Sequence, residues 1–280
     1  MKVEVVSLPA LRVDGSSARA HTQGLEIAGG SYYVTARRED VRPKRALLLR
    51  VEPGATNWDV WDITPSAPAG TATALDHPGG MQSDGTRLWI PIAASRPKSR
   101  TIIRAFRLSG IVANQTLRPD FEFLVDDHIG ALAVDPGRAM LIGANWDTEM
   151  VYVWDLEGHL KRTLAGSTLA QRSLGVADRH TGVAVQDWKT IGGCLCASGL
   201  VKAPEPPSLS SSRWLSFTNF LEPDFGSIAV DLPLQDGTEL AREAMAVSEG
   251  SVYFLPQELG TANRLFRLPL SALLNRESVK

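Results

Sequence analysis

Histidine is the side chain best suited to acid–base chemistry near neutral pH, because its ordinary pKa is about 6.5. Three of the five histidines in the chain stand at the start of similar short segments. The segments open at His21, His77 and His128, and each reaches a small residue three positions later. If these segments are equivalent strands, the imidazoles gather in an arc at one end of the structure. The arc could supply a general base, for which we single out His77 and His128.

Polar side chains two residues beyond the histidines extend this candidate site. The equivalent positions in five segments hold Gln23, Gly79, Gly130, Gln186 and Glu243. We predict that His21, the two amides and the carboxylate bind a polar ligand. Imidazole and carboxylate are also ligands for divalent metals, so a metal at this place stays open as an alternative. A purely structural alternative is that the histidines hydrogen-bond to neighbouring backbone and tie the segments together.

Two basic loops repeat the motif Arg-Pro-Lys. It occurs at Arg42-Pro43-Lys44 and again at Arg96-Pro97-Lys98. Arginine recognises carboxylate and phosphate groups in a bidentate manner. We therefore predict that Arg42, Arg96 and Lys98 bind an anionic ligand beside the histidine arc, and that Arg42 or Arg96 neutralises a substrate. The alternative is a solvated charged surface.

The elements that would position these residues are pairs of short strands joined by tight turns. Five copies occur, with the common small or polar position at Gly24, Gly80, Ala131, Asp187 and Ala244. The separations are 56, 51, 56 and 57 residues, and the ends of the chain close the circle with a repeat of 60. Near-equal repeats of this size, rich in β-forming residues, are typical of propellers. We predict an all-β fold, a single five-bladed β-propeller domain over residues 1–280.

The remaining strands of each predicted blade follow in order along the chain. They are residues 46–51 and 58–63, 101–108 and 121–125, 150–155 and 160–164, 214–218 and 227–232, and 264–268. The fifth blade lacks an outer strand after residue 268, so the N-terminal run 3–8 is predicted to close the ring and cover its edge. Residues 201–212, which contain three prolines, are either a lid or a long connection.

Composition narrows the functional classes. The net charge is −2, from 29 basic and 31 acidic residues, which does not indicate nucleic-acid binding. No apolar run approaches the roughly 20 residues of a membrane helix. Cys194 and Cys196 are separated by a single residue, a spacing at which a disulfide would be strained, so two free thiols are expected. We expect a cytoplasmic monomer, although an export signal could have been removed.

Several segments resemble known repeat proteins. Trp154-Asp155 after a strand resembles a WD repeat, and a packed strand tryptophan before a turn aspartate explains the same pattern. Residues 22–27, Thr-Gln-Gly-Leu-Glu-Ile, resemble the opening of plant-type glutaminyl cyclotransferases, which are five-bladed propellers. In that family a catalytic glutamate follows on the next strand, whereas the matching residues 34–36 here contain no acid. The resemblance therefore implies the fold without the activity.

A second resemblance covers about residues 20–270. Its motifs are His77-Pro78-Gly79-Gly80, Trp-Ile-Pro-Ile-Ala at residues 89–93, Arg-Pro-Lys-Ser at 96–99, and Asp127-His128-Ile129-Gly130. They are similar to motifs of a group of bacterial five-bladed propeller proteins of uncharacterised function. This likeness implies a propeller and no particular reaction.

The function expected from these observations is binding of a small anionic or peptide-like ligand at the propeller mouth, with or without chemistry on it. Serine-hydrolase elbows, Walker loops and dinucleotide fingerprints do not occur in the sequence. The alternative is a non-catalytic scaffold that presents one face to a partner protein. A deep mouth with converging His, Gln and Arg would favour the ligand, and a flat face with exposed aromatics would favour the scaffold.

Overall fold

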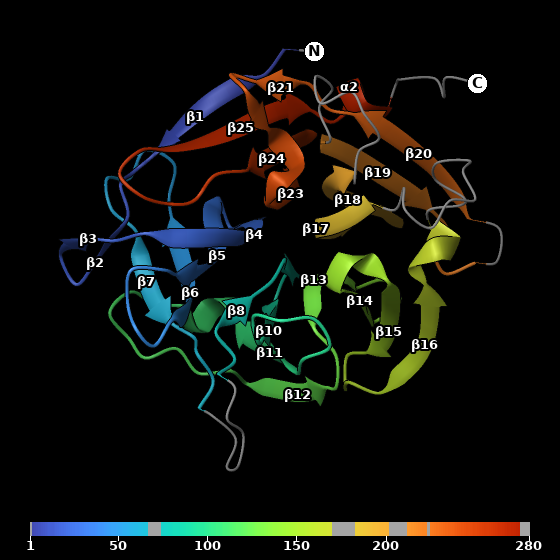
Figure 1. Cartoon of the computed structure of the whole chain (residues 1–280), viewed down its shortest axis with the longest axis horizontal. Helices are drawn as coiled ribbons and strands as arrows, with labels where there is room; N and C mark the ends of the chain where they lie inside the picture. The colour runs from blue at the N-terminus through green and yellow to red at the C-terminus, as the bar shows by residue number, and fades with distance from the viewer. Residues whose placement is uncertain (1, 67–73, 170–182, 202–211, 223–224, 275–280) are drawn as a thin grey trace.

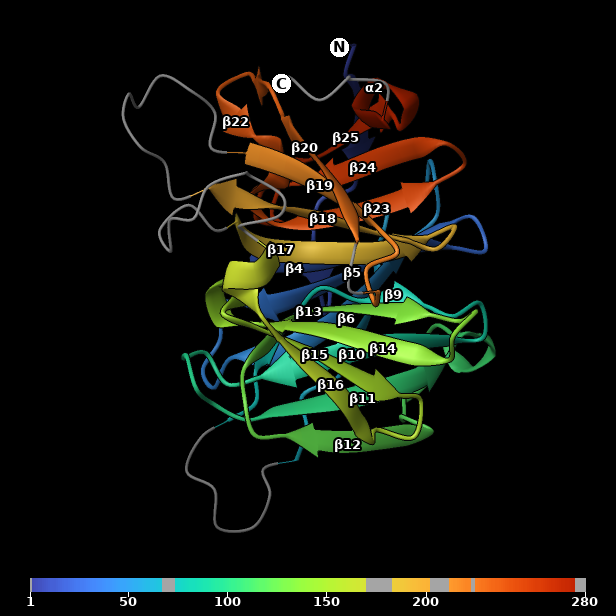
Figure 2. The same ribbon diagram turned by 90° about the vertical axis from the view of Figure 1, so that its right-hand side faces the viewer.

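The computed structural model describes residues 2–66, 74–169, 183–201, 212–222 and 225–274. Five antiparallel sheets surround a central axis, and each sheet presents its innermost strand to that axis (Figure 1). Seen from the side, the sheets are stacked as twisted layers (Figure 2). The predicted five-bladed propeller is therefore confirmed.

Each blade is formed by consecutive strands, except the last. Blade one contains β4 (Ala20–Ala28), β5 (Ser31–Arg38), β6 (Arg45–Val51) and β7 (Asp59–Asp62). Blade two contains β8 (His77–Pro78), β9 (Gln82–Ser83), β10 (Arg87–Ala93), β11 (Thr101–Arg107) and β12 (Phe121–Val125). Blade three contains β13 (Ile129–Asp135), β14 (Met140–Asn145), β15 (Met150–Asp155) and β16 (Leu160–Ala165). Blade four contains β17 (Val183–Ile191), β18 (Cys194–Val201), β19 (Ser212–Thr218) and β20 (Gly226–Asp231).

Blade five joins the two ends of the chain. Its strands are β23 (Ala244–Ser248), β24 (Ser251–Leu255), β25 (Asn263–Pro269) and, on the outside, β1 (Glu4–Leu8). The β1–β25 ladder runs antiparallel from the Glu4–Arg267 pair to the Leu8–Asn263 pair. Figure 1 shows the blue β1 lying beside the red β25. Ring closure by the N-terminal strand, as predicted, is confirmed.

Two-residue turns join the first and second strands of blades one, four and five. Both turn residues have positive φ: 57° and 80° at Gly29-Gly30, 54° and 82° at Gly192-Gly193, and 48° and 70° at Glu249-Gly250. This is the conformation of hairpin turns whose twist matches that of the strands, and it favours glycine. The Gly-rich turns read from the sequence thus set the register of these hairpins.

Five apolar clusters fill the five blade interfaces. Alternate residues of one strand face opposite neighbours: on β6, Leu47 and Leu49 pack toward blade five, and Leu48 packs toward blade two. In blade five, the consecutive residues Tyr253 and Phe254 likewise face opposite neighbours and belong to different clusters. Strands covered on both faces need apolar residues at consecutive positions. This explains the uninterrupted apolar runs in the sequence.

Three local features differ from the sequence predictions. The first strand of blade two is not continuous, because Gly80 leaves the sheet to form a bridge with Ala131 of blade three between β8 and β9. The entrance of blade five is a 3-10 turn, η3 (Leu240–Arg242), rather than extended chain. Two small hairpins were also not anticipated: β2 (Arg12–Val13) with β3 (Ser16–Ser17), and β21 (Leu234–Gln235) with β22 (Thr238–Glu239). Short helical turns also occur, among them η1 (Leu108–Gly110), η2 (Trp146–Thr148) and α2 (Ser271–Leu274).

Other expectations concern thiols, helices and the proline-rich loop. Cys194 and Cys196 are both free, and burial raises the pKa of the Cys196 thiol to about 12. Trp154 is buried and stacks on Tyr152, as expected of a packed strand tryptophan. Of the helices in the described ranges, none has the length and apolar character needed to cross a membrane. The predicted lid or connection lies almost wholly outside the described residues, because 202–211 are not among them.

Candidate functional site

The three histidines meet at one end of the channel. The ring centroids of His21 and His77 are 6.4 Å apart, and those of His77 and His128 are 5.4 Å apart. They line a cavity of about 280 Å³ that we call the mouth pocket. Its lining is His21, Gln23, His77, His128, Gly130, Asn145, Trp146, Asp147, Val185, Gln186, Leu200, Arg242 and Glu243. All five blades or their entrances contribute, so the register shared by the repeats places these residues together.

A β-bulge shapes the entrance of several blades. The pairing shifts by one residue between Thr22 and Gly24, between Ile129 and Ala131, and between Val185 and Asp187. A bulge adds one residue to a strand and redirects its side chains. In blades one and four the extra residues, Gln23 and Gln186, line the mouth pocket together with the histidine arc.

His77 is a neutral imidazole whose two nitrogens are both engaged. A guanidinium only donates, so Nδ1 accepts the hydrogen bond from Arg37 at 3.0 Å and Nε2 carries the proton. Nε2 then donates to the Gln23 Oε1 at 3.0 Å. Burial, followed by the charge of Arg37, lowers the pKa of His77 to about 2. With its only lone pair occupied, His77 is poorly placed to act as a general base.

His128 has the opposite tautomer. Carbonyl oxygens only accept, so Nδ1 carries the proton that is shared between Ala94 O at 2.9 Å and Arg96 O at 3.2 Å. His128 is 2% exposed, and within the described residues no hydrogen bond reaches its Nε2, whose lone pair is therefore unpaired. Burial lowers the pKa of His128. A neutral imidazole fixed through Nδ1 with Nε2 available is the arrangement of a base, an acceptor or a metal ligand.

His21 and Glu243 form the blade-five side of the pocket. The His21 Nε2 lies 3.9 Å from Glu243 Oε2, and Nδ1 lies 3.9 Å from Glu258 Oε1. Burial lowers the pKa of His21 and raises the pKa of Glu243 to about 8. The attraction of Arg242 opposes this rise, and the repulsion of Glu258 adds to it. Glu243 is thus a carboxylic acid at neutral pH and can donate a hydrogen bond into the pocket.

Trp146 supplies the apolar wall. Its ring meets His128 edge to face, with centroids 4.7 Å apart, and 36% of the residue is exposed. The turn that presents it contains Asp147 and Thr148, both with φ of 56°. Residues other than glycine rarely adopt this conformation, and such strain tends to occur at functional sites. An exposed indole face on a constrained turn is suited to contact a planar or apolar part of a ligand.

The predicted basic residues are not part of the mouth pocket. Arg42, Arg96 and Lys98 do not line it. The guanidinium of Arg42 folds back to donate to the carbonyl oxygens of Glu39 at 3.0 Å and Val41 at 2.8 Å. The loop of Arg96 contributes through its main chain, because the Arg96 carbonyl holds the His128 ring. The structure therefore does not bring these three side chains to the histidines.

Two other arginines, Arg37 and Arg242, lie near the histidines instead, and the sequence analysis predicted neither of them. Arg37 pairs with His21 across the β4–β5 hairpin and reaches His77, while its Nε binds Glu39 at 2.5 Å. The register of the Gly-Gly hairpin was the signal that could have identified it. Arg242 lines the pocket, is exposed, and makes no hydrogen bond or ion pair to the described residues. No sequence signal distinguishes Arg242, because its position depends on the η3 turn.

Below the mouth, the channel is closed by the innermost strands. A Cβ at Gly79 would collide with the Gly130 carbonyl, and a Cβ at Gly80 would collide with the Asp187 carboxylate. The glycines of the His-Pro-Gly-Gly motif therefore allow the inner strands to touch. Asp187 accepts hydrogen bonds from the Leu25 and Met245 amides at 3.1 Å each, and binds Lys189 at 2.5 Å. This buried carboxylate joins blades one, four and five under the pocket.

The metal alternative gains no support from side-chain placement. Within the described ranges, no three His, Cys, Asp or Glu side chains are grouped so that they could hold a metal ion. The mouth pocket instead combines neutral imidazoles, amides, a protonated carboxyl group at Glu243, the carboxyl group of Asp147 and one arginine.

Fold and site together define a five-bladed β-propeller with a pocket of ligand size at one channel mouth. A family model matches residues 55–205, and the chain belongs to that family, described as a family of unknown function (DUF6454). No curated protein matches the sequence closely enough to count as a relative.

Solved structures share the architecture at low sequence identity. A luciferin-regenerating enzyme has a TM-score of 0.53 and 8% identity, with 95% of each chain covered. A GH43 glycoside hydrolase engineered for endo-xylanase and exo-arabinofuranosidase activity has a TM-score of 0.56 and 12% identity, over 96% of this chain and 52% of that one. A bifunctional GH43-CE protein of Bacteroides eggerthii has a TM-score of 0.58 and 9% identity, over 91% and 34%. At such identities the likeness concerns the fold alone.

Proposed function

We propose that this propeller binds, in the mouth pocket, a small ligand that has an anionic group and a planar or apolar face. One observation carries the proposal: the exposed Arg242, the protonated Glu243, His128 with its unpaired Nε2 and the exposed Trp146 line a single cavity. Enzymes occur among proteins with the same fold, including the luciferin-regenerating enzyme and the GH43 hydrolases. Their presence is consistent with a ligand at this place.

Most polar side chains of the mouth pocket are donors, which supports an anion, and the carboxyl group of Asp147 is the acidic exception in its lining. Arg242 offers up to five N–H donors, and the amides of Gln23 and Gln186 offer more. Glu243 adds an O–H donor because burial keeps it protonated. The unpaired Nε2 of His128 is an acceptor and suits a hydroxyl or amine on the same ligand. Charge-assisted hydrogen bonds from arginine to a carboxylate are among the stronger polar contacts.

If the ligand is a substrate, we propose His128 rather than His77 as the base. The lone pair of His77 is held by Arg37, whereas Nε2 of His128, a residue that lines the pocket, accepts no hydrogen bond from the described residues. His77 then serves to fix Gln23, whose Oε1 accepts its Nε2 proton. A base must be able to reach the proton that it removes, and this criterion separates the two histidines.

The scaffold alternative finds less support. Among the described Phe, Tyr and Trp residues, Trp146 is the only exposed one, and it lies in the pocket rather than on a flat face. A surface for a protein partner is generally enriched in exposed aromatics. The converging His, Gln and Arg side chains instead match the feature expected of a ligand site.

Calorimetric titration with benzoate and benzamide tests the proposal. The two probes share a planar ring and differ in charge. We expect benzoate to bind and benzamide to bind at least tenfold more weakly. Arg242→Gln should weaken benzoate binding about tenfold or more, since hydrogen bonds to charged groups contribute about 1.5–3 kcal/mol. Arg42→Gln is the matched control, because Arg42 does not line the pocket, and it should bind benzoate as the parent does. Equal binding of both probes, or loss of binding in Arg42→Gln alone, would contradict the proposal.

A further inference from the structure

A second cavity continues from the mouth pocket toward blade five. It has a volume of about 640 Å³ and shares His21, Arg242 and Glu243 with the mouth pocket. Its other walls are the β21–β22 hairpin, through Gly237, Thr238 and Glu239, and residues 256–258. We call this cavity the lateral groove. Because three residues line both spaces, a ligand seated in the mouth can extend into the groove without leaving the protein surface.

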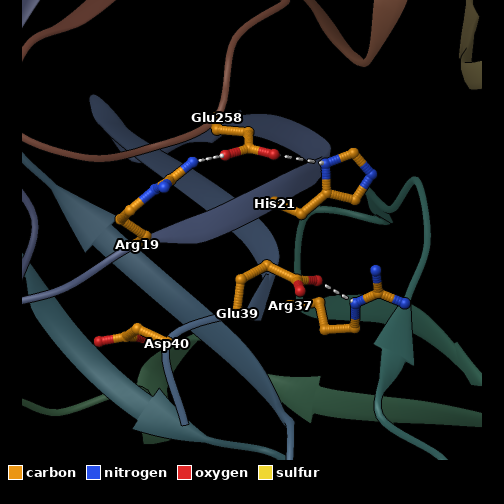
Figure 3. A pocket seen from close by; sticks show the side chains of 6 residues that line it. All are labelled: Arg19, His21, Arg37, Glu39, Asp40 and Glu258. Atoms are coloured by element: carbon orange, nitrogen blue, oxygen red, sulfur yellow. Dashed lines mark hydrogen bonds and ion pairs between the residues drawn. The ribbon is translucent and has the colours of Figure 1, made fainter.

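The lateral groove is acidic. Its charged side chains are Glu239 and Glu258 against Arg242, since Glu243 is protonated. Arg242 faces the mouth pocket as well, where the proposed anionic group binds. Figure 3 shows Glu258 between Arg19 and His21, at 2.9 Å and 3.9 Å respectively. Arg19 is 73% exposed at its side chain, so this ion pair is weak in water. An arriving cation can compete for Glu258 at little cost.

The lining also indicates which kind of chain would lie there. Sugar rings are commonly stacked on aromatic faces, and apart from His21 the described lining of the groove has no aromatic ring. The polar and carboxyl groups of the groove instead suit amide groups and a cationic side chain. Because His21, Arg242 and Glu243 line both cavities, consecutive residues of one extended peptide can occupy the mouth and the groove.

We propose that the natural ligand is a peptide whose C-terminal carboxylate enters the mouth pocket and whose preceding basic residue lies in the lateral groove. The inference rests on the proposed function, because the carboxylate is the anionic group assigned to the mouth. A C-terminal aromatic residue places its ring against Trp146. The basic side chain then meets Glu239 and Glu258, which supply the negative charge of the groove.

Titrations with four probes test this ligand class. They are N-acetylphenylalanine, which reaches only the mouth; acetyl-Gly-Arg-Phe; its C-terminal amide; and acetyl-Gly-Glu-Phe. We expect acetyl-Gly-Arg-Phe to bind at least tenfold more tightly than N-acetylphenylalanine. Amidation should remove most of this affinity, and the glutamate peptide should bind no better than N-acetylphenylalanine. The same order should appear more clearly at low salt, because exposed charges are screened.

A pair of variants on one hairpin isolates the groove. Glu239→Gln removes a carboxylate that lines the groove and not the mouth, and should lower affinity for acetyl-Gly-Arg-Phe about two- to fivefold, the range of a solvent-exposed ion pair. Asp236→Asn is the matched control, because Asp236 pairs with Arg264 at 3.3 Å and does not line the groove. It should leave the peptide affinity unchanged. Both variants should bind N-acetylphenylalanine as the parent does.

The possible outcomes distinguish failure of the groove proposal from failure of the mouth-pocket proposal. Equal binding of both free-acid peptides and N-acetylphenylalanine, with weaker binding of the amide, would show that the groove takes no peptide residue while the mouth still holds a carboxylate. Equal binding of all four probes would show that the carboxylate is not recognised, and would overturn the proposed function as well. Absence of binding by every probe would overturn the proposed function itself. Tight binding of cellotetraose that is weakened by Glu239→Gln would replace the peptide by an oligosaccharide as the occupant.

Discussion

Burial and hydrogen bonding give the mouth residues their chemical character. Burial lowers the pKa of all three histidines in the arc, so they are neutral at physiological pH. Two of them have fixed and opposite tautomers: His77 donates from Nε2 to Gln23, and His128 donates from Nδ1 to backbone carbonyls. The same sequence position in two blades therefore holds the same side chain in two different chemical roles.

Glu243 leads to a prediction about stability and pH. Its folded pKa, about 8, lies above the unfolded value near 4.5, so only the folded state holds this proton between those pH values. The contribution of Glu243 to stability is therefore lost as pH rises from about 4.5 to 8. Glu243→Gln mimics the protonated acid and should melt like the parent at pH 4.5. Above pH 8 it should be more stable, by about 1–3 kcal/mol on the scale of 1.36 kcal/mol per pKa unit.

Melting curves from pH 4 to 9 check this expectation. Glu26 is also buried, with its pKa raised to about 8, but it is present in both proteins and cancels in the difference. Glu52→Gln, at an exposed position, is the control and should follow the parent at every pH. A Glu243→Gln protein that is less stable than the parent at high pH would show that the carboxylate is the stabilising form.

At the scale of strands, features set by a local sequence pattern could be predicted, and features set by contacts between blades could not. Gly29-Gly30 and Gly192-Gly193 mark hairpins whose turns have the required positive φ, and this was readable from the sequence. The break between β8 and β9 was not readable, since Gly80 is drawn away by Ala131 of another blade.

The candidate site follows the same division. The histidine arc was predictable, because a repeat places equivalent residues at equivalent positions. The cations of the site were not, because a side chain's direction in an irregular loop depends on its local partners. Arg42 turns back onto the carbonyl oxygens of Glu39 and Val41. Arg242 reaches the mouth from a 3-10 turn that no periodicity indicates.

We predict that strand β1 stabilises the protein by closing the ring. Removing residues 1–10 deletes the ladder with β25 and the Pro9 carbonyl, which accepts from Trp58 at 2.9 Å and from Asn263 at 2.6 Å. Each buried donor left without a partner costs about 1–3 kcal/mol. We expect a fall in the melting temperature of at least about 10 °C, since 1 kcal/mol corresponds to about 2–4 °C for a domain of roughly 150–250 residues.

Two further proteins make the β1 experiment interpretable. Removal of residues 1–2 alone leaves β1 whole and should not change the melting temperature. Leu8→Ala keeps the strand but removes a buried side chain, and should cost about 2–3 kcal/mol in unfolding free energy. A truncation of residues 1–10 that melts with the parent would mean that β1 does not hold the ring closed.

At the scale of the whole molecule, the centre of the ring is polar. Asp187 and Lys189 are both almost fully buried and form an ion pair under the mouth pocket. Asp187 also accepts hydrogen bonds from backbone amides of blades one and five, so one carboxylate links three blades. Breaking such a pair on one side leaves an uncompensated buried charge, which costs more than the pair itself contributes.

Asp187→Asn should therefore destabilise the whole ring. We expect a loss of about 3–5 kcal/mol in unfolding free energy, the usual range for removing one partner of a buried ion pair. Asp231→Asn, in an exposed pair with Arg213, is the matched control and should cost no more than about 1 kcal/mol. Urea titration of the two variants measures the difference. Similar losses in both would show that Asp187 does not link the blades.

The central claim is that an anion binds among Arg242, Glu243, His128 and Trp146 at the mouth of this propeller. Crystals soaked in 4-iodobenzoate test it directly, because the anomalous signal of iodine locates the probe without assumptions about its pose. The account predicts one strong peak in the mouth pocket, with the carboxylate density against Arg242. A peak beside Arg42 or Lys98 with an empty mouth, or occupancy of the mouth that persists unchanged in Arg242→Gln crystals, would contradict it.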